Sequence, residues 1–459
     1  MRRIIYVIPF TSIIEQNAEV FRSAFGKDAV LEHHSNLIPD ETDEKNLDQA
    51  RYRLQAATEN WDAPFIVTTN VQFFESLFAA RSSRCRKLHN ISRSVVILDE
   101  AQLVPAELIT PIVSVMRTLQ KCFGVTFLFM SATRPSWPGM PQCREIVPDP
   151  VALAATLKRV EIKMPEITNE RQEWSQIAEE LCQFEQVLCI VNSRRDCRDL
   201  FSAMPEGSIH LSALMCPAHR SRVISAIRAS LAGKQPLRVI STQLVEAGVD
   251  LDFPVVFRAL AGLDSIAQAA GRCNREGRQV KPGLVKVFIP PKPAPRGLLL
   301  KSEQTTRELI SMGNLDPLHP ASFEKYFELF FSRVNDMGES FMKLLTPQGG
   351  ANLSIQFRTA AEQFKIIDEG GSANVLVRYR EGDQLINELA DRGPSRGLLR
   401  KLQRYSVSVP RWLCGRLHTD GILETVREEF LVQSRLEAYS DVYGLDIFME
   451  AFAPEDLVL

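Results

Sequence analysis

The stretch Val95-Val96-Ile97-Leu98-Asp99-Glu100-Ala101-Gln102 joins a short apolar run to two adjacent carboxylates. An apolar run of this length is typical of a strand that is buried on both faces of a parallel sheet. In open α/β sheets ligands bind beyond the carboxyl ends of the strands, which is where Asp99 and Glu100 would lie. One acid there can hold Mg²⁺ through its waters, and its neighbour can orient an attacking water. The alternative is a strand followed by a solvated acidic turn.

Short apolar runs alternate with helical patterns on both sides of this stretch. The runs predict strands at 4–8, 65–68, 95–98, 126–130, 187–191, 209–211, 237–241, 255–257 and 285–289. Amphipathic patterns predict helices at 11–25, 71–80, from 105 onward, and at 172–184, 195–204 and 218–231. Strands that alternate with helices indicate doubly wound α/β domains with parallel sheets.

Two groups of prolines divide the chain, because proline interrupts both helices and sheets. The groups are Pro135, Pro138, Pro141, Pro148 and Pro150, and then Pro290, Pro291, Pro293 and Pro295. Beyond the second group the pattern is mostly helical, with helices expected at 321–333 and 398–404 and strands at 375–379 and 405–409. We therefore predict two α/β domains, 1–150 and 151–290, and a linker with a mostly helical accessory domain, 291–459.

Composition narrows the class of protein. The 459 residues carry a net charge of −2, so a nucleic-acid partner would have to be bound by local basic patches. The nine cysteines include no Cys-x-x-Cys pair, which argues against a zinc site or a disulfide framework and suits a reducing cytoplasm. The apolar run that starts at Ile4 is too short for a secretory core or a membrane span.

Two further strand ends carry small polar residues. Ser131 and Thr133 follow the strand at 126–130, where their hydroxyls can bond the carboxylates of the preceding strand end. Gly248 and Asp250 lie beyond the strand at 237–241, where the glycine permits an unusual turn and the acid can bond a phosphate or a ribose. The alternatives are ordinary turns and helix caps.

The segment Gln268-Ala269-Ala270-Gly271-Arg272-Cys273-Asn274-Arg275-Glu276-Gly277 carries two arginines three positions apart. On a helix, Arg272 and Arg275 would share one face. Two guanidinium groups on one face can neutralise a transferring γ-phosphoryl group. The alternative is the solvated basic end of a helix.

In this order and spacing the motifs resemble a superfamily 2 helicase of the DEAD/DEAH type. More narrowly, the chain resembles the CRISPR-associated helicase-nuclease of type I systems. The narrower resemblance is carried by YVIPFTSIIEQN at 6–17, LEHHSN at 31–36, TTNVQFFESL at 68–77 and LVEAGVDLD at 244–252. It covers residues 4–290 well and the remainder only by position. The fold that it implies is two tandem RecA-like parallel-sheet domains, the first incomplete, and a C-terminal accessory domain.

The resemblance also implies roles for individual residues. Asp99 and Glu100 are expected to hold Mg²⁺ and activate water, and Arg272 and Arg275 to act as arginine fingers. The expected ATP-site and coupling residues are Gln102, Ser131, Thr133, Gly248, Asp250 and Gln268. The residues expected to line the path of a single strand are Phe10, Thr11, Thr68, Thr69, Asn192 and Thr242.

The sequence departs from the family pattern at two places. Gln102 stands where histidine or aspartate is usual, although glutamine can still bond across a domain cleft. Helicases of this class also carry a glycine-rich loop ending in Gly-Lys-Ser/Thr, whose amides cradle phosphates. The only Gly-Lys pairs in the chain, at Gly26 and Gly233, have no hydroxyl residue after the lysine.

The His-Asp pair of the family's nuclease domain is also absent from the sequence. His33 and His34 lie between helicase motifs, and we interpret them as structural or strand-contacting rather than as metal ligands. We therefore expect an N-terminally truncated chain, or one half of a split gene. In the second case a separate chain would supply the nuclease and the phosphate-binding loop.

The implied function is ATP-dependent, 3′–5′ movement along single-stranded DNA in CRISPR antiviral defence, with ATP and Mg²⁺ as cofactors. The implied partner is an RNA-guided surveillance complex that opens the target DNA; the expected location is the cytoplasm, and no membrane partner is expected. A non-catalytic nucleic-acid-binding fragment, or a subunit that needs a partner chain, is the competing hypothesis. A DEAD/DEAH helicase outside CRISPR systems is a third.

Two basic patches belong to no motif. The first comprises Arg81, Arg84, Arg86, Lys87 and Arg93, and the second Arg396, Arg400, Lys401, Arg404 and Arg411. Either patch can contact nucleic acid or a partner, or can be a solvated surface.

Overall fold

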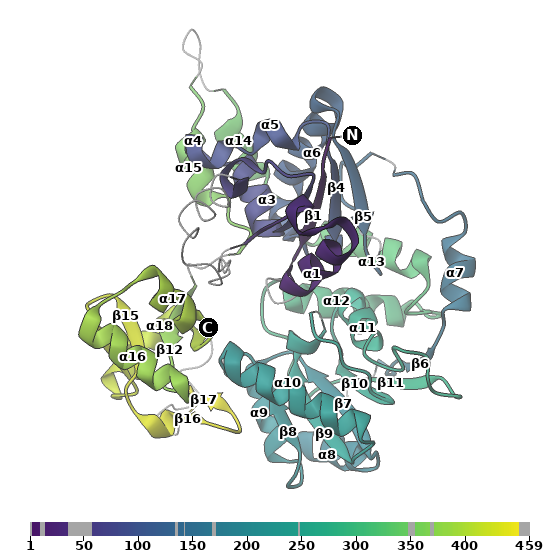
Figure 1. The fold of residues 1–459 in the computed structure, drawn as a ribbon. Helices are drawn as coiled ribbons and strands as arrows, with labels where there is room; N and C mark the ends of the chain where they lie inside the picture. The colour runs from purple at the N-terminus through teal and green to yellow at the C-terminus, as the bar shows by residue number, and fades with distance from the viewer. Residues whose placement is uncertain are drawn as a thin grey trace. The chain divides into compact units, whose positions relative to one another are not determined.

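The computed structural model describes residues 2–9, 14–34, 57–133, 136–141, 143–167, 171–246, 248–347, 354–367 and 371–448. The chain forms two compact units, and each is built from two separate stretches (Figure 1). Unit 1 comprises Met1–Ala152 and Leu318–Ile367, and unit 2 comprises Leu153–Pro317 and Asp368–Leu459. Helix α7 (Pro150–Thr156) spans the first division between them.

Unit 1 contains a five-stranded sheet with the order β2-β3-β1-β4-β5, in which every pairing is parallel. The strands are β1 (Ile4–Ile8), β2 (Val30–His33), β3 (Phe65–Thr69), β4 (Val95–Asp99) and β5 (Thr126–Met130). The helices are α1 (Ile14–Phe25), α3 (Asn70–Leu77), α4 (Ser82–Cys85), α5 (Leu88–Ile91) and α6 (Ile109–Phe123), with short 3-10 turns η2 (Lys27–Ala29), η3 (Ala101–Leu103) and η4 (Ala106–Leu108). The predicted parallel α/β fold is therefore confirmed; the start of the helix predicted at 11–25 lies outside the described residues.

The open edge of this sheet is apolar. Among the described residues β5 pairs only with β4, and its side chains from Phe127 to Phe129 are half-buried while Met130 is 42% exposed. By contrast β3, which lies between β2 and β1, is buried along its whole length.

Three helices from later in the sequence complete unit 1: α13 (Pro320–Ser332), α14 (Glu339–Leu345) and α15 (Phe357–Gln363). Phe78 stacks on Phe364 with ring centroids 4.0 Å apart and contacts Phe341 edge-on. The backbone N–H of Thr110 donates to the carbonyl of Met337 over 2.8 Å. These contacts attach α14 and α15 to α3 and α6.

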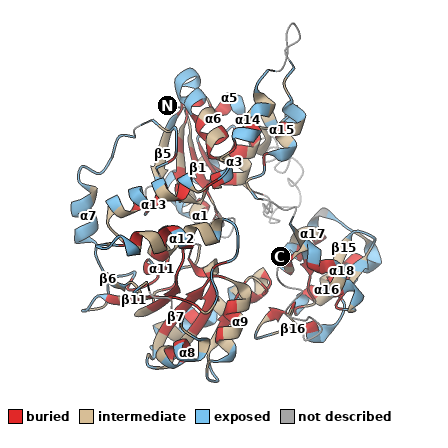
Figure 2. Cartoon of the chain, turned by 180° about the vertical axis from the view of Figure 1, so that it is seen from behind, coloured by how far each residue is buried: buried red, intermediate tan, exposed pale blue. Residues whose placement is uncertain are grey.

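Unit 2 contains a six-stranded parallel sheet with the order β6-β11-β10-β7-β9-β8. The strands are β6 (Val160–Lys163), β7 (Gln186–Val191), β8 (Ile209–Leu211), β9 (Leu237–Thr242), β10 (Val255–Ala259) and β11 (Gly283–Phe288). The helices are α8 (Trp174–Cys182), α9 (Arg194–Ser202), α10 (Pro217–Ala232), α11 (Leu263–Ala270) and α12 (Leu298–Ser311), with the 3-10 turn η5 (Gln243–Val245). The central strand β7 is buried over Val187–Val191, as Figure 2 shows.

The last part of unit 2 is a smaller α/β layer with a mixed four-stranded sheet of order β13-β12-β15-β14. Its elements are β12 (Ser372–Leu376), α16 (Glu381–Arg392), α17 (Arg396–Gln403), β13 (Ser406–Pro410), α18 (Arg411–Thr419), β14 (Leu423–Val426), β15 (Phe430–Gln433), η6 (Leu436–Ala438), β16 (Tyr439–Ser440) and β17 (Gly444–Leu445). Gly444, at φ +78°, lets β17 lie close to the backbone of Leu214, which follows β8 of the six-stranded sheet. A Cβ at this position would lie 2.3 Å from the carbonyl oxygen of Leu214. The core of this layer is shared with Leu214 and Cys216 of the six-stranded domain.

The predicted third domain, 291–459, is divided between the two units. Residues Leu318–Ile367 pack within unit 1, whereas Asp368–Leu459 belong to unit 2 together with the second sheet. No helix in the described part of the chain is both long enough and apolar enough to cross a membrane.

Candidate nucleotide and nucleic-acid sites

The two predicted acids lie at the carboxyl end of β4 in unit 1. The Tyr6 hydroxyl, from the neighbouring strand β1, donates to Asp99 Oδ2 over 2.9 Å, and the backbone N–H of Glu100 donates to Asp99 Oδ1 over 3.0 Å. Burial and the Asp99 carboxylate raise the pKa of the Tyr6 phenol well above its usual value, so Tyr6 remains a donor. Asp99 is therefore held in one orientation by two donors.

A second chain of bonds leads from Glu100 to the end of β5. The Gln102 amide donates to Glu100 Oε2 over 2.5 Å and accepts a bond from the Ser131 hydroxyl over 2.5 Å. Ser131 Oγ also accepts from the backbone N–H of Thr133 over 3.1 Å. Glu100 itself has a left-handed backbone with φ 47°, a conformation that is costly for a residue with a Cβ. The structure thus brings together Asp99, Glu100, Gln102, Ser131 and Thr133.

Thr68 and Thr69 end the buried strand β3 and have local partners. The Thr68 hydroxyl donates to the carbonyl of His33 over 2.9 Å, and the Thr69 hydroxyl caps α3 by accepting from the backbone N–H of Gln72 over 3.1 Å. Trp61 Nε1 donates to His33 Nδ1 over 3.0 Å, and burial lowers the pKa of His33 to about 3. Phe10 and Thr11, which were also predicted to line the strand path, lie outside the described residues.

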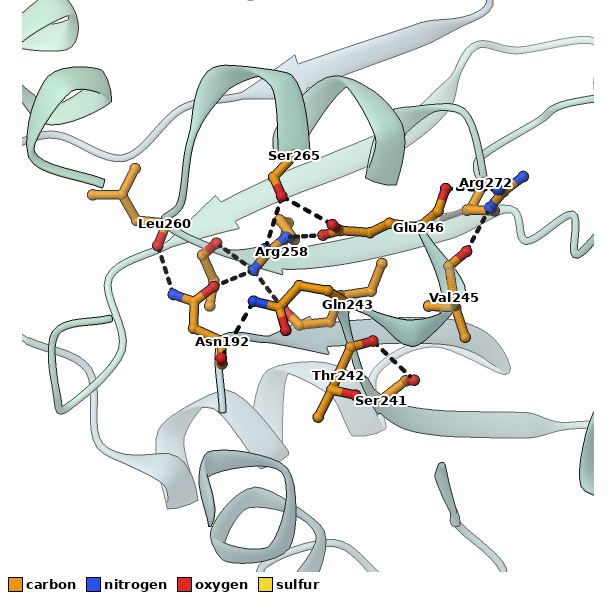
Figure 3. Close-up of polar contacts among 12 residues, drawn as sticks. Asn192, Ser241, Thr242, Gln243, Val245, Glu246, Arg258, Leu260, Ser265 and Arg272 are labelled. Carbon is orange, nitrogen blue, oxygen red and sulfur yellow. Dashed lines mark hydrogen bonds and ion pairs between the residues drawn. The ribbon is translucent and has the colours of Figure 1, made fainter. Parts of the chain in front are cut away.

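Unit 2 holds a buried polar network behind its predicted site residues (Figure 3). Arg258, in the middle of β10, is fully buried and pairs through Nε with Glu246 over 2.7 Å. Its Nη1 donates to Asn192 Oδ1 over 2.7 Å, and the Ser265 hydroxyl donates to Glu246 Oε2 over 2.9 Å. Burial raises the pKa of the Glu246 carboxyl, and the charge of Arg258 opposes that rise.

Asn192 is engaged on both sides of its amide. Besides accepting from Arg258, it donates through Nδ2 to the carbonyl of Leu260 over 2.8 Å. Its own carbonyl accepts a bond of 3.2 Å from the Gln243 amide, which joins it to the end of β9 and thereby to Thr242. The side chain of Asn192 therefore positions the surrounding segments.

Arg272 is buried and binds the backbone of the segment 245–246, which also carries the Glu246 side chain of this network. Its Nε donates to the carbonyl of Val245 over 2.7 Å and its Nη2 to the carbonyl of Glu246 over 2.6 Å (Figure 3). In this arrangement the guanidinium serves as a clamp on the backbone.

Arg275 is half-exposed and lies in a different environment. Its Nε lies 3.3 Å from Asp250 Oδ1, and its backbone N–H donates to Asp252 Oδ1 over 2.7 Å. The premise that Arg272 and Arg275 share a helix face is wrong, because α11 ends at Ala270 and the chain then turns, with Asn274 at φ 45°. The turn separates a buried arginine from an exposed one.

The remaining predicted residues of unit 2 lie close to this network in the sequence. Gly248 has a positive φ of 73°, as the expected turn requires. Gln268, on α11, has a buried Nε2 with no hydrogen-bond partner among the described residues. A buried amide without a partner is costly, so Gln268 is available to a ligand or to a rearranged neighbour.

Sequence reasoning missed Tyr6, Arg258 and Glu246. The signal for Arg258 was present, because a charged residue in the middle of the apolar run Val255–Ala259 needs a buried partner. Tyr6 gave no such signal, since a tyrosine in a buried strand is ordinary.

The residues of unit 1 fit a magnesium nucleotide. Within the described ranges no cluster of three or more His, Cys, Asp or Glu side chains could hold a metal ion. Mg²⁺ in nucleotide sites needs only one or two carboxylates together with phosphates and water, which Asp99 and Glu100 can satisfy. The hydroxyl of Thr133 is buried and has no partner among the described residues, which also suits an incoming polar group.

Comparisons with protein families and with curated proteins both find the same kind of relative. Residues 183–278 match the profile of a family described as the C-terminal part of the CRISPR-associated nuclease/helicase Cas3. A protein of that name from Haloferax volcanii is 26% identical over 384 residues, covering 60% of this chain and 41% of its own length. A relative from Methanocaldococcus jannaschii is 23% identical over 304 residues, covering 61% of this chain and 40% of its own. The chain thus spans about two fifths of the length of these curated relatives.

Solved structures share the fold. The crystal structure of T. fusca Cas3 with AMPPNP has a TM-score of 0.63 at 16% identity, covering 94% of this chain and 62% of that one. A chain of a CRISPR RNA-guided surveillance complex in a pre-nicking state has a TM-score of 0.52 at 16% identity, covering 96% of this chain and 67% of that one. The two parallel-sheet domains of this chain therefore share the fold of the RecA-like domains of these Cas3 structures. The family profile, the curated relatives and the fold therefore agree in one respect: each makes the chain similar to the CRISPR-associated Cas3 helicase-type proteins.

Proposed function

We propose that this chain provides the ATP-driven motor of a CRISPR defence helicase, which moves 3′–5′ along single-stranded DNA. In this proposal the motor unwinds target DNA that an RNA-guided surveillance complex has opened. The polarity, the DNA substrate and the partner complex follow from the family, and each is part of the proposal.

The observation that carries the proposal is the bonded chain Tyr6–Asp99 and Glu100–Gln102–Ser131 at the carboxyl edge of β1, β4 and β5. Two adjacent carboxylates with different supporting partners can take different roles. Asp99, fixed by two donors, is suited to a static electrostatic role beside Mg²⁺. Glu100, whose carboxylate accepts a bond from the Gln102 amide, is suited to orienting water.

Bound ATP with Mg²⁺ would supply the phosphoanhydride bond and the charge of the metal. The chain would supply the residues that position the phosphates and the attacking water. Gln102 couples Glu100 to Ser131, so a change at the acid is transmitted to the loop that follows β5. In unit 2 the Arg272 guanidinium and the Glu246 carboxylate fix the segment that follows β9. Thr242 is the last residue of β9 and so lies directly before this segment. Arg275, half-exposed beside Asp250, is the better candidate for a phosphate contact.

ATP hydrolysis by the purified chain, with and without single-stranded DNA, tests the proposal. We expect DNA-stimulated turnover that falls by about two to four orders of magnitude in Glu100→Gln, because the amide cannot act as a base. Glu107→Gln is the matched control, since Glu107 is exposed on η4 only seven positions away and should have no effect.

Turnover that is equal in Glu100→Gln and the wild type would refute the catalytic assignment. DNA binding without turnover would instead support the competing function, a nucleic-acid-binding subunit that needs a phosphate-binding loop from elsewhere. That alternative is favoured by one observation, the lack of a Gly-Lys-Ser/Thr sequence in these 459 residues.

A further inference from the structure

Arg258 is a fully buried cation in the middle of β10, a strand that lies between β11 and β7. Burying a guanidinium is costly unless its nitrogens have partners. Nε forms the ion pair with Glu246 over 2.7 Å, Nη1 donates to Asn192 Oδ1 over 2.7 Å, and Nη2 donates to Ser265 Oγ over 3.5 Å. The three nitrogens thus contact three different side chains.

The three partners come from segments that follow three neighbouring strands. Asn192 follows β7, Glu246 follows β9 through the turn η5, and Ser265 belongs to α11, which follows β10. These strands lie side by side in the order β10-β7-β9. In the part of the chain that the structure describes, no hydrogen bond joins the side chain of Asn192 directly to that of Ser265, so the two meet through the guanidinium (Figure 3).

These segments also carry residues that the proposed function uses. Thr242, which is expected to contact a bound strand, ends β9, and the amide of the next residue, Gln243, donates to the carbonyl of Asn192 over 3.2 Å. Gln268, which is expected in the ATP site, lies three positions after Ser265 and therefore on the same face of α11. Its buried Nε2 has no partner among the described residues, so the placement of α11 decides what this amide can reach.

We propose that Arg258 is a positioning residue that couples the strand-binding segments of unit 2, at Asn192 and Thr242, to the nucleotide-binding helix α11. This role rests on the proposed function, because that function assigns the two ligands; Arg258 itself touches neither of them. A guanidinium is a planar fork whose donors point in fixed directions. When a bound strand displaces Asn192, the fork cannot keep its bonds to Asn192 and to Ser265 in the same geometry, so the displacement reaches α11 through contiguous hydrogen bonds.

The first test compares ATP hydrolysis with and without single-stranded DNA in the wild type and in Arg258→Lys. Lysine keeps the charge opposite Glu246 but replaces the fork by a single ammonium group. We expect the ratio of the stimulated rate to the basal rate to fall by about fivefold or more, with the basal rate nearly unchanged. A residue that only supports the fold would lower both rates together, so an unchanged ratio would overturn the proposal.

Arg238→Lys is the matched control for this test. Arg238 is a half-buried arginine of the same sheet, near the amino end of β9, and its Nη2 donates to the carbonyl of Cys182 over 3.1 Å. This variant should keep the wild-type ratio. Ser265→Ala removes the hydroxyl between the guanidinium and α11 but leaves the ion pair, so it should lower the ratio even if Arg258→Lys fails to fold.

The second test needs neither ATP nor DNA, and it measures amide hydrogen exchange along residues 263–270. Asn192→Ala removes the acceptor of Arg258 Nη1, so we expect exchange in α11 to become faster. The effect should disappear in the Ser265→Ala background, because the link to α11 is then already broken. An effect that persists in that background would travel through the bond from Asn192 to the carbonyl of Leu260, and would overturn the proposal.

Asn387→Ala is the control for the exchange measurement. Asn387 likewise accepts a bond from an arginine, Arg378, over 2.9 Å, but it lies in the C-terminal layer, so exchange in α11 should not change. The two tests separate this role from the proposed function. Faster exchange in Asn192→Ala without any ATP hydrolysis would keep Arg258 as the link between the segments and remove the motor. DNA-stimulated hydrolysis with the same ratio in Arg258→Lys and the wild type would keep the motor and remove the role of Arg258.

Discussion

His33 is kept neutral by burial, and this makes unit 1 sensitive to acid. Its pKa is lowered to about 3, and its Nδ1 accepts a bond from Trp61, which a proton on that nitrogen would abolish. Between pH 3 and pH 6.5 the unfolded chain binds a proton at His33 that the folded chain excludes. The free energy of unfolding therefore falls as the pH drops through this window, by at most about 1.4 kcal/mol per pH unit from this group.

Denaturant unfolding of the wild type and of His33→Asn across pH 4–7 checks this expectation. The asparagine oxygen can replace Nδ1 as the acceptor but does not titrate, so the variant should lose this part of the pH dependence. Identical pH profiles would show that His33 does not bear the acid sensitivity.

At the same scale, sequence reasoning predicted a group of polar residues whose type and place at strand ends are themselves the signal. Asp99, Glu100 and Ser131 were predicted together, and hydrogen bonds through Gln102 connect Glu100 to Ser131. The partners that orient residues were harder to predict, because Tyr6 reaches Asp99 only through the pairing of β1 with β4. A contact between residues 93 positions apart cannot be read from local pattern.

At the scale of elements, the Arg258–Glu246 pair joins β10, the turn after β9, the end of β7 and α11. Breaking a buried pair from one side leaves an uncompensated charge, so Arg258→Met and Glu246→Met should each cost about 3–5 kcal/mol of unfolding free energy. The double variant should cost much less than the sum, because no charge then remains buried alone. Urea denaturation of the four proteins measures the coupling; additive losses would show that the pair is not a unit.

Two of the strands that sequence reasoning missed are short and polar on one side. It predicted β1, β5 and β8 with their observed bounds, because each is a compact apolar run. It missed β2 and β6, which lie at sheet edges and include Glu32, His33, Glu161 and Lys163. An edge strand with one solvated or paired face lacks the continuous apolar run that marks a central strand.

At the scale of the whole molecule, unit 1 depends on a segment that lies beyond the second RecA-like domain in sequence. A protein made of residues 1–152 alone should unfold with low cooperativity and bind a hydrophobic dye, because Phe78 and α6 lose their partners on α14 and α15. Joining residues 318–367 to it through a flexible linker should restore a cooperative transition. Calorimetry of the two proteins decides the matter, and equal transitions would mean that the late segment is dispensable.

The proline-rich stretch near residue 290 suggested one domain boundary, yet the contacts that define unit 1 cross it. The prolines indicate where a helix or a strand ends. They do not indicate against which domain the following helices pack. That choice is made by side chains such as Phe341 and Phe364, whose partner Phe78 is far away in sequence.

This return path has a consequence for synthesis on the ribosome. The Glu75 carboxylate accepts a bond from the backbone of Ile366, a partner translated 291 residues later. The first sheet is made before the six-stranded domain, and its apolar helix faces stay uncovered until residues 318–367 have followed that domain. In a cell this chain would be most exposed to chaperones and proteases during that interval, so the speed of translation through the second domain would set how much of the protein survives.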